Sequence, residues 1–190
     1  MATTDKASPR DRLLDAAAQL FYREGVFVGV EALCRAAGVS KRSMYQQFES
    51  KDEVLAESLL RQAPSITAEF EPADPESLTP RERIMYVFER LEKLSVEPRY
   101  HGCPYLSVLV EIKDPGHPAG VVARELKARM GTMFRAEAER GGVREPELLA
   151  RRLMILYDGA SARAGSGVER LDDGLLTSTA AVFLDAAGLV

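Results

Sequence analysis

The hydrophobic residues of this 190-residue chain recur at helical spacing almost from end to end, as expected for helices that bury one face. The first such face contains Leu13, Ala17 and Phe21. It follows Ser8-Pro9, a serine cap with proline at the first helical position. The sequence therefore predicts a helix that begins near residue 9 and ends at the glycine at position 25, and an all-α fold for the whole chain.

Proline- and glycine-rich breaks separate the later apolar faces, and one of these breaks is a loop at residues 71–78. A helix is expected to start at Lys51 and run towards Phe70. Pro64 should kink or break it, because proline cannot donate the helical hydrogen bond. Further helices are expected at residues 80–94, 104–110, 118–140, 146–164 and 173–187.

Residues 30–48 predict two short helices joined by a tight turn. Gly38 can end the first helix in the left-handed conformation, which glycine adopts without a steric cost. Ser40 can cap the second helix through its hydroxyl. Met44 and Phe48, four positions apart, would anchor that helix to the core. This arrangement is a helix-turn-helix, and it leaves a polar face directed towards base edges in a major groove.

The side chains of that polar face suit two kinds of DNA contact. Arg42 can donate to guanine, and Gln46 or Gln47 can pair with adenine. Hydroxyl, phenol and ammonium donors suit phosphate oxygens, although the ring of Tyr45 could instead pack beside Phe48. The candidate DNA-binding residues are Lys41, Arg42, Ser43, Tyr45, Gln46, Gln47 and Lys51.

The next helix opens with a capping box at residues 50–53. Ser50 would cap the helix, and the Glu53 carboxylate would accept a hydrogen bond from the Ser50 N–H. Lys51 opposes the helix dipole in this first turn, so it points either at an anion such as a DNA phosphate or into solvent.

These segments resemble the tetracycline-repressor (TetR/AcrR) family. Residues 38–48 followed by 50–55 are similar to its DNA-binding signature, and residues 12–25 to its first helix. The resemblance implies a three-helix DNA-binding domain at residues 8–55 and a helical ligand-binding and dimerisation domain at 56–190. It also implies a homodimer on a palindromic double-stranded DNA operator, released by a small-molecule inducer. One departure is Val28-Gly29-Val30, where the family usually has a Thr or Ser that caps the second helix.

The formal net charge of −4 does not fit a general nucleic-acid binder. The positive potential must therefore be local, on a face formed by Lys41, Arg42 and Lys51 with the N-terminal arm. No apolar run approaches the roughly 20 residues that cross a bilayer, and residues 1–6 lack the apolar stretch of a signal peptide. Two cysteines make no disulfide framework, so a cytoplasmic protein without membrane contact is expected.

The last two predicted helices combine large apolar residues with small ones such as Gly159, Ala160 and Ala180. Small residues let helices approach closely, so this pair is the candidate interface of a homodimer, or else it covers the core of a monomer. An inducer pocket is expected in the same part of the chain. Its candidate wall, which could equally be plain core, comprises Tyr86, Tyr105, Leu109, Met130, Phe134, Met154 and Tyr157.

Other chemistry-bearing residues have less specific patterns. Cys103 precedes a predicted helix near His101, a setting that favours a thiolate and hence an oxidant or electrophile sensor, unless the thiol is simply buried. Glu111 and Asp158 fall on apolar helices, where they would meet a ligand or an internal partner such as Arg90 or Arg163. Nothing fixes a metal site, and neither a metal nor another cofactor is expected.

Two other classes of protein compete with a regulator. An enzyme is not expected, because the sequence has no glycine-rich phosphate loop, no nucleophile elbow and only two histidines. A helical adaptor could use the helix-turn-helix as a protein-binding scaffold. Arg42 and the two exposed glutamines favour the regulator over the adaptor.

Overall fold

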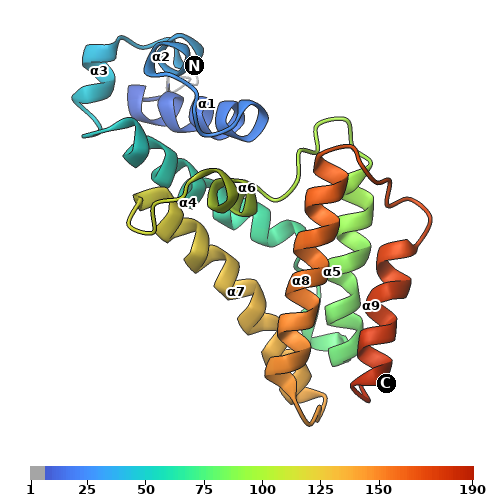
Figure 1. Ribbon diagram of the computed structural model, residues 1–190. Coiled ribbons are helices and arrows are strands. Elements are labelled where there is room, and N and C mark those ends of the chain that lie inside the picture. The colour runs from blue at the N-terminus through green and yellow to red at the C-terminus, as the bar shows by residue number, and fades with distance from the viewer. Residues whose placement is uncertain (1–6) are drawn as a thin grey trace, which may run out of the picture. The chain divides into compact units, whose positions relative to one another are not determined.

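The computed structural model describes residues 7–190, where it contains nine α-helices and no strand (Figure 1). The all-α prediction is confirmed. The N-terminal arm expected to add positive charge, residues 1–6, lies outside the described residues. The helices are α1 (Pro9–Glu24), α2 (Val30–Ala37), α3 (Lys41–Tyr45), α4 (Lys51–Glu69), α5 (Pro80–Ser95), α6 (Pro104–Glu111), α7 (Pro118–Arg140), α8 (Pro146–Gly165) and α9 (Leu175–Ala186), with a 3-10 turn at Pro75–Ser77.

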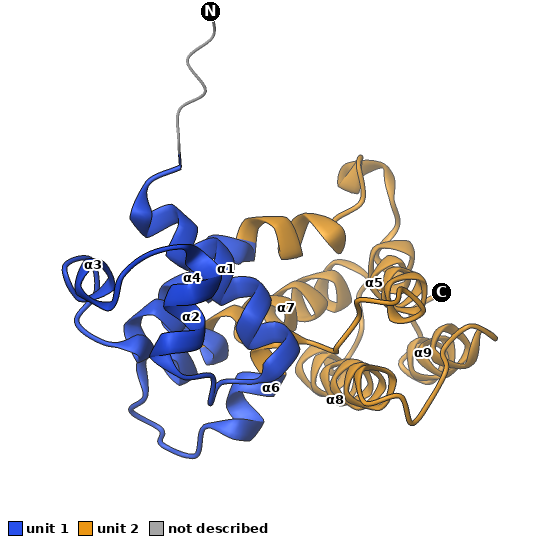
Figure 2. Ribbon diagram, turned by 90° about the horizontal axis from the view of Figure 1, so that it is seen from above, with its two compact units in different colours: residues 1–63, 107–124 blue, residues 64–106, 125–190 orange. Residues whose placement is uncertain are grey.

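The chain forms two compact units, coloured separately in Figure 2. The first unit joins the N-terminal residues up to Ala63 with a distant segment, Ser107–Arg124. The second unit comprises Pro64–Leu106 and Glu125–Val190. The hydrophobic pattern did not anticipate that residues 107–124, around the corner between α6 and α7, would pack with the N-terminal helices.

The first unit is organised by helix caps and a small apolar core. Ser8 caps α1 by accepting a hydrogen bond from the Asp11 N–H. Leu13, Leu33 and Val54, which come from α1, α2 and α4, are fully buried. These side chains leave water on folding, and their burial holds the short α2 and α3, which would not be stable alone.

The second unit contains α5, α8 and α9 lying side by side (Figure 1). Thr79 and Glu82 form a capping box at the start of α5. Phe88 of α5 stacks on Phe134 of α7 with ring centroids 5.7 Å apart, and both side chains are fully buried. The predicted apolar faces of α5 and α7 therefore meet in the core of this unit, to which α8 and α9 also contribute buried leucines.

Several local expectations differ from the structure. The helix does not end at Pro64: α4 continues to Glu69 with the proline inside it, where one helical hydrogen-bond donor is missing. The Glu53 carboxylate accepts from the N–H of Glu49, at 2.6 Å, rather than from that of Ser50. The last helix begins at Leu175, two residues later than expected, because the Asp173 carboxylate accepts from the Leu175 N–H. No described helix is long and apolar enough to cross a bilayer.

Candidate nucleic-acid interface

The turn between α2 and α3 has the geometry that its sequence predicts. Gly38 lies in the left-handed region, with φ 63° and ψ 39°. The Ser40 hydroxyl accepts a hydrogen bond from the Ser43 N–H at 3.0 Å. Met44 and Phe48 are 0% and 2% exposed. Since these two side chains anchor one face of the segment, the other face is directed to solvent.

The exposed face carries the residues expected to read bases. Arg42, Gln46 and Gln47 are exposed, and Tyr45 is 54% exposed, whereas Ser43 is half-buried. The α3 helix ends at Tyr45, so the two glutamines lie in the turn that follows it. A helical hydrogen bond from the Phe48 N–H to the Met44 carbonyl, at 2.9 Å, spans that turn. The structure thus brings these candidates together on one accessible surface.

Lys41 is exposed but is paired with an acid of the preceding helix. Its Nζ lies 2.5 Å from a carboxylate oxygen of Glu31 on α2. The hydrogen bond with Glu31 raises the pKa of Lys41, and the same bond lowers the pKa of Glu31. The cation of Lys41 is therefore partly offset before any phosphate arrives.

Lys51 has a partner that the sequence did not predict. Its Nζ donates to the carbonyl oxygen of Val26 at 2.8 Å, in a part-buried position. The ammonium group also lies 5.9 Å from the centre of the Phe21 ring, a favourable cation–π geometry. In this state Lys51 holds the loop between α1 and α2 instead of pointing into solvent.

The start of α2 reflects the departure at residues 28–30. Gly29 occupies the N-cap with extended backbone angles and without a side-chain hydrogen bond to the first turn. A hydroxyl-bearing residue would satisfy one of those N–H groups. The first-turn amides of α2 therefore lack a side-chain cap.

The residues expected to line an inducer pocket differ in burial and in the unit to which they belong. Tyr105, Phe134 and Tyr157 are buried, and burial raises the pKa of Tyr105 and Tyr157. Phe134 packs on Phe88, and Tyr157 meets Phe70 edge-on with centroids 5.7 Å apart. Leu109 falls in the first unit, whereas the other six candidates fall in the second. Phe134 and Tyr157 are thus packed against neighbouring aromatic rings of the second unit.

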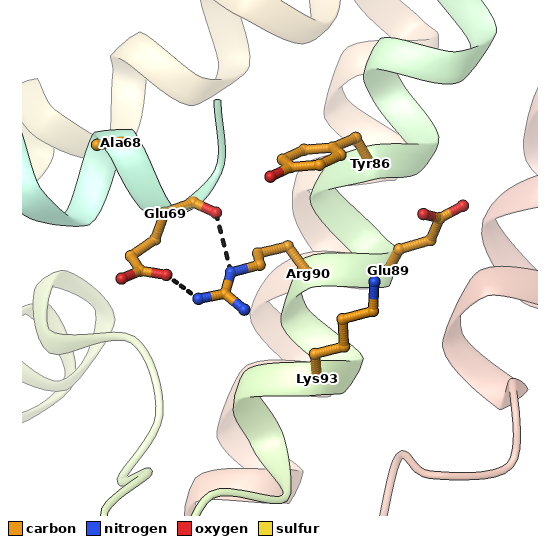
Figure 3. Close-up of a pocket in the computed structure, with 6 residues that line it drawn as sticks. All are labelled: Ala68, Glu69, Tyr86, Glu89, Arg90 and Lys93. Carbon is orange, nitrogen blue, oxygen red and sulfur yellow. Dashed lines mark hydrogen bonds and ion pairs between the residues drawn. The ribbon is translucent and has the colours of Figure 1, made fainter. Parts of the chain in front are cut away.

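Tyr86 lines an open pocket of about 350 Å³ between the end of α4 and α5 (Figure 3). Arg90 crosses this pocket to bind Glu69, donating to its carbonyl oxygen at 3.2 Å and pairing with its carboxylate. The remaining lining residues are Ala68, Glu89 and Lys93. The charged members of this pocket were not predicted, although residues 86, 89, 90 and 93 recur at the spacing of one helical face.

Comparison with known proteins decides the family. Residues 13–58 match the model of the bacterial regulatory proteins, tetR family. A crystal structure from Streptomyces avermitilis, described as a candidate TetR transcriptional regulator, is 55% identical to this chain. It covers 97% of this chain and 100% of its own, with a TM-score of 0.93. The chain belongs to the TetR family. This family consists of transcriptional regulators and not of enzymes.

Two further relatives set the limits of the comparison. A helix-turn-helix-type transcriptional regulator of Mycobacterium tuberculosis is 30% identical over 92 residues, which are 45% of this chain and 46% of the relative. This TetR-family chain thus spans about half the length of the curated relatives it matches. A TetR-family regulator from Streptomyces coelicolor has a TM-score of 0.81 at 23% identity and covers 94% of this chain and 93% of its own. At that identity the likeness shows the fold alone.

The cysteine that directly precedes α6 in this TetR-family chain is buried. Cys103 is 6% exposed. Burial raises the pKa of its thiol and outweighs the opposing effect of the Lys127 cation. The sequence left two alternatives, a thiolate favoured by the helix dipole and His101 or a simply buried thiol, and the desolvation of Cys103 supports the second. The environment of Cys103 in this structure favours the protonated thiol.

The two acids on apolar helices have internal partners, but not the arginines suggested by the sequence. The Glu111 carboxylate accepts a hydrogen bond from the Val26 N–H at 2.8 Å. Asp158 pairs with Lys127. Arg90 and Arg163 pair instead with Glu69 and Glu169, respectively. These pairings depend on which helices pack together, which the sequence pattern does not specify.

Proposed function

We propose that this TetR-family chain is a ligand-responsive transcriptional repressor, which binds a palindromic operator as a homodimer and is released by a small-molecule inducer. The observation that carries the DNA-binding part is the exposed polar face of α3 on a well-anchored helix-turn-helix. Met44 and Phe48 fix the segment from inside, so Arg42 and the glutamines keep a defined orientation. Such preorganisation lowers the entropy that binding must overcome.

Each candidate DNA-binding side chain has a proposed role. Arg42 donates to guanine, and Gln46 or Gln47 pairs with adenine in the major groove. Ser43, Tyr45, Lys41 and Lys51 contact phosphates and so fix the register. For Lys41 and Lys51 the phosphate would replace or share the present partners, Glu31 and the Val26 carbonyl.

The proposed dimer uses an apolar stripe on α8 and α9. Ile155 is 74% exposed, and Gly159 and Ala162 are exposed at the positions four and seven residues later on α8. On α9, Val182 is 62% exposed and Leu175 is 47% exposed. Ala160 and Ala180, expected on this surface, are buried and do not belong to it. Two-fold symmetry would place two recognition helices about 34–36 Å apart, one helical turn of DNA.

The proposed inducer site lies among the second unit's candidate residues. The pocket at Tyr86 combines a phenol with the charged Arg90, Lys93 and Glu89, which suits a ligand with polar groups. The buried rings of Tyr105 and Tyr157 offer an apolar wall. Met130, Phe134 and Met154 complete the proposed ligand-contacting set of the second unit, and Leu109, which falls in the first unit, is left out of it.

Selection of bound DNA from a random duplex library tests the proposal directly. The regulator is expected to enrich a palindromic sequence, and its binding is expected to weaken as salt rises. An adaptor or an enzyme would enrich nothing. The absence of any enriched sequence would overturn the DNA-binding assignment.

Substitutions at two positions then separate base reading from phosphate contact. Arg42→Ala is expected to cost about 1–3 kcal/mol of binding free energy and to relax discrimination at one base pair.

Lys51→Ala should weaken binding to all sequences and reduce the slope of log affinity against log salt concentration by about one. Arg99→Ala, at an exposed position in the second unit, is the matched control. Intact operator binding in both variants would refute these assignments.

A further inference from the structure

Val26, in the loop between α1 and α2, is held at both ends of its backbone. Its N–H donates to a carboxylate oxygen of Glu111 at 2.8 Å, and its carbonyl accepts from the Lys51 ammonium at 2.8 Å. The residue is only 5% exposed. A buried N–H without an acceptor is costly, so Glu111 satisfies a group that water does not readily reach.

The Glu111 carboxylate lies against the backbone of Gly25 as well as that of Val26. A Cβ atom added to Gly25 would lie 2.8 Å from the Glu111 carboxylate oxygen, and Gly25 has φ +83°, which disfavours any other residue. Glu111 is the last residue of α6, 85 positions away from Val26 in sequence. A second contact joins the segment 107–124 to α4: the Nε2 atom of His117 lies 3.3 Å from a carboxylate oxygen of Asp52 in the first turn of that helix.

The loop at Val26 leads directly into the helix-turn-helix. It ends at Gly29, the N-cap of α2, which makes no side-chain hydrogen bond to the helix. The α3 helix packs on α2, and in a helix-turn-helix the first helix crosses the DNA backbone while the second reads bases. The backbone position of Val26 therefore influences where α2 starts and how α3 is presented.

We infer that Glu111 is a positioning residue for DNA binding. It holds the loop between α1 and α2, with Lys51 holding the other end of the same residue, and so fixes the orientation of the helix-turn-helix. This role rests on the proposed DNA-binding function and goes beyond it, because Glu111 comes from the distant segment 107–124 and needs no contact with DNA. The necessary feature is an acceptor at the right distance, not a negative charge.

Two substitutions in the full-length chain separate these features. Glu111→Gln removes the charge but keeps an oxygen that can accept from the Val26 N–H. Glu111→Asp keeps the charge but withdraws the carboxylate by one carbon. Affinity for the duplex selected by the wild-type chain is measured by fluorescence anisotropy at fixed salt. Glu125→Ala, which removes the same charge from an exposed position on α7, is the control.

The expected result is a loss of about tenfold for Glu111→Asp, the size of one lost hydrogen bond. Glu111→Gln and Glu125→Ala should stay within about threefold of wild type. Hydrogen exchange should accelerate in residues 25–33 of Glu111→Asp, while peptides from the rest of the first unit keep their protection. Base preference should not change, because positioning affects all sequences alike.

Three results would overturn the inference. The first is DNA affinity of Glu111→Asp equal to that of wild type. The second is a loss of affinity in Glu111→Gln as large as that in Glu111→Asp. The third is accelerated hydrogen exchange throughout the first unit of Glu111→Asp, which would indicate general destabilisation. In each case a wild-type chain that still enriches a duplex leaves the proposed function standing. A wild-type chain that enriches none would overturn both.

Discussion

Glu137 shows how a single buried charge is stabilised in the second unit. Glu137 is 4% exposed, and its carboxylate oxygens lie 2.9 Å from Nη1 of Arg83 and 2.7 Å from Nη2 of Arg140. A carboxylate in such a place is tolerated only when it is paired. The sequence places Glu137 on α7 three residues before Arg140, but it could not show that Arg83 of α5 would meet the same carboxylate.

Removal of this carboxylate should therefore destabilise the fold. Glu137→Ala is expected to lower the free energy of unfolding by about 3 kcal/mol, because the partly buried Arg83 loses its counter-charge. Urea denaturation followed by circular dichroism measures the change. Glu139→Ala, at a 52% exposed side chain on the same helix, should change it by less than about 0.5 kcal/mol. Equal effects at the two positions would contradict the explanation.

The raised pKa of Cys103 predicts low reactivity near neutral pH. Only the thiolate attacks iodoacetamide or peroxide. Burial raises the pKa of the Cys103 thiol above the ordinary cysteine pKa of about 8.5, so the protonated form is favoured at neutral pH. Native chain at pH 7 should thus be modified at Cys103 much more slowly than urea-unfolded chain, as judged by mass spectrometry. Rapid modification of the folded protein would instead support a sensor.

At the scale of elements, the helix caps were the most predictable features. Ser8 and Ser40 each cap the helix that the sequence assigned to them, because a cap joins residues only three positions apart, and Thr79 caps α5 in the same way. The cap of α9 is different. Glu92 of α5 accepts hydrogen bonds from the N–H groups of Leu176 and Thr177 at 2.9 and 3.0 Å. A partner 84 positions away leaves no local signal.

The end of α8 depends on the absence of a side chain. A Cβ atom on Gly165 would lie 2.5 Å from the backbone nitrogen of Gly102, and backbone atoms cannot move aside easily. Gly165→Ala is expected to lower the free energy of unfolding by about 2 kcal/mol through this clash. The measurement is again urea denaturation.

A matched glycine on α7 provides the control. A Cβ on Gly131 would meet Met154 at 3.7 Å, an ordinary contact. Gly131→Ala should therefore stabilise the chain by about 0.5–1 kcal/mol, since alanine loses less backbone entropy in a helix. Equal destabilisation by Gly165→Ala and Gly131→Ala would show that neither the close approach at Gly165 nor helix propensity sets the change in the free energy of unfolding.

At the scale of the whole molecule, the exposed stripe on α8 and α9 predicts the oligomeric state. Ile155→Glu combined with Val182→Glu places charges in the proposed interface, where burial without a partner is costly. Light scattering should show a monomer for this variant and a dimer for wild type. Val96→Glu, at a 48% exposed valine outside these helices, should remain dimeric. A dimeric double variant would place the interface elsewhere.

Local side-chain chemistry was enough to predict the helices to within a few residues, the caps at Ser8 and Ser40, and the exposed polar face that carries Arg42, Gln46 and Gln47. These features follow from side chains within a few positions of one another, so periodicity and capping chemistry encode them directly. The long-range contacts, by contrast, came from tertiary packing: Lys51 binds the Val26 carbonyl, Glu111 binds the N–H of the same residue, and Cys103 is buried. Those outcomes depend on which helices meet, because packing distant segments together excludes water and sets every long-range partner.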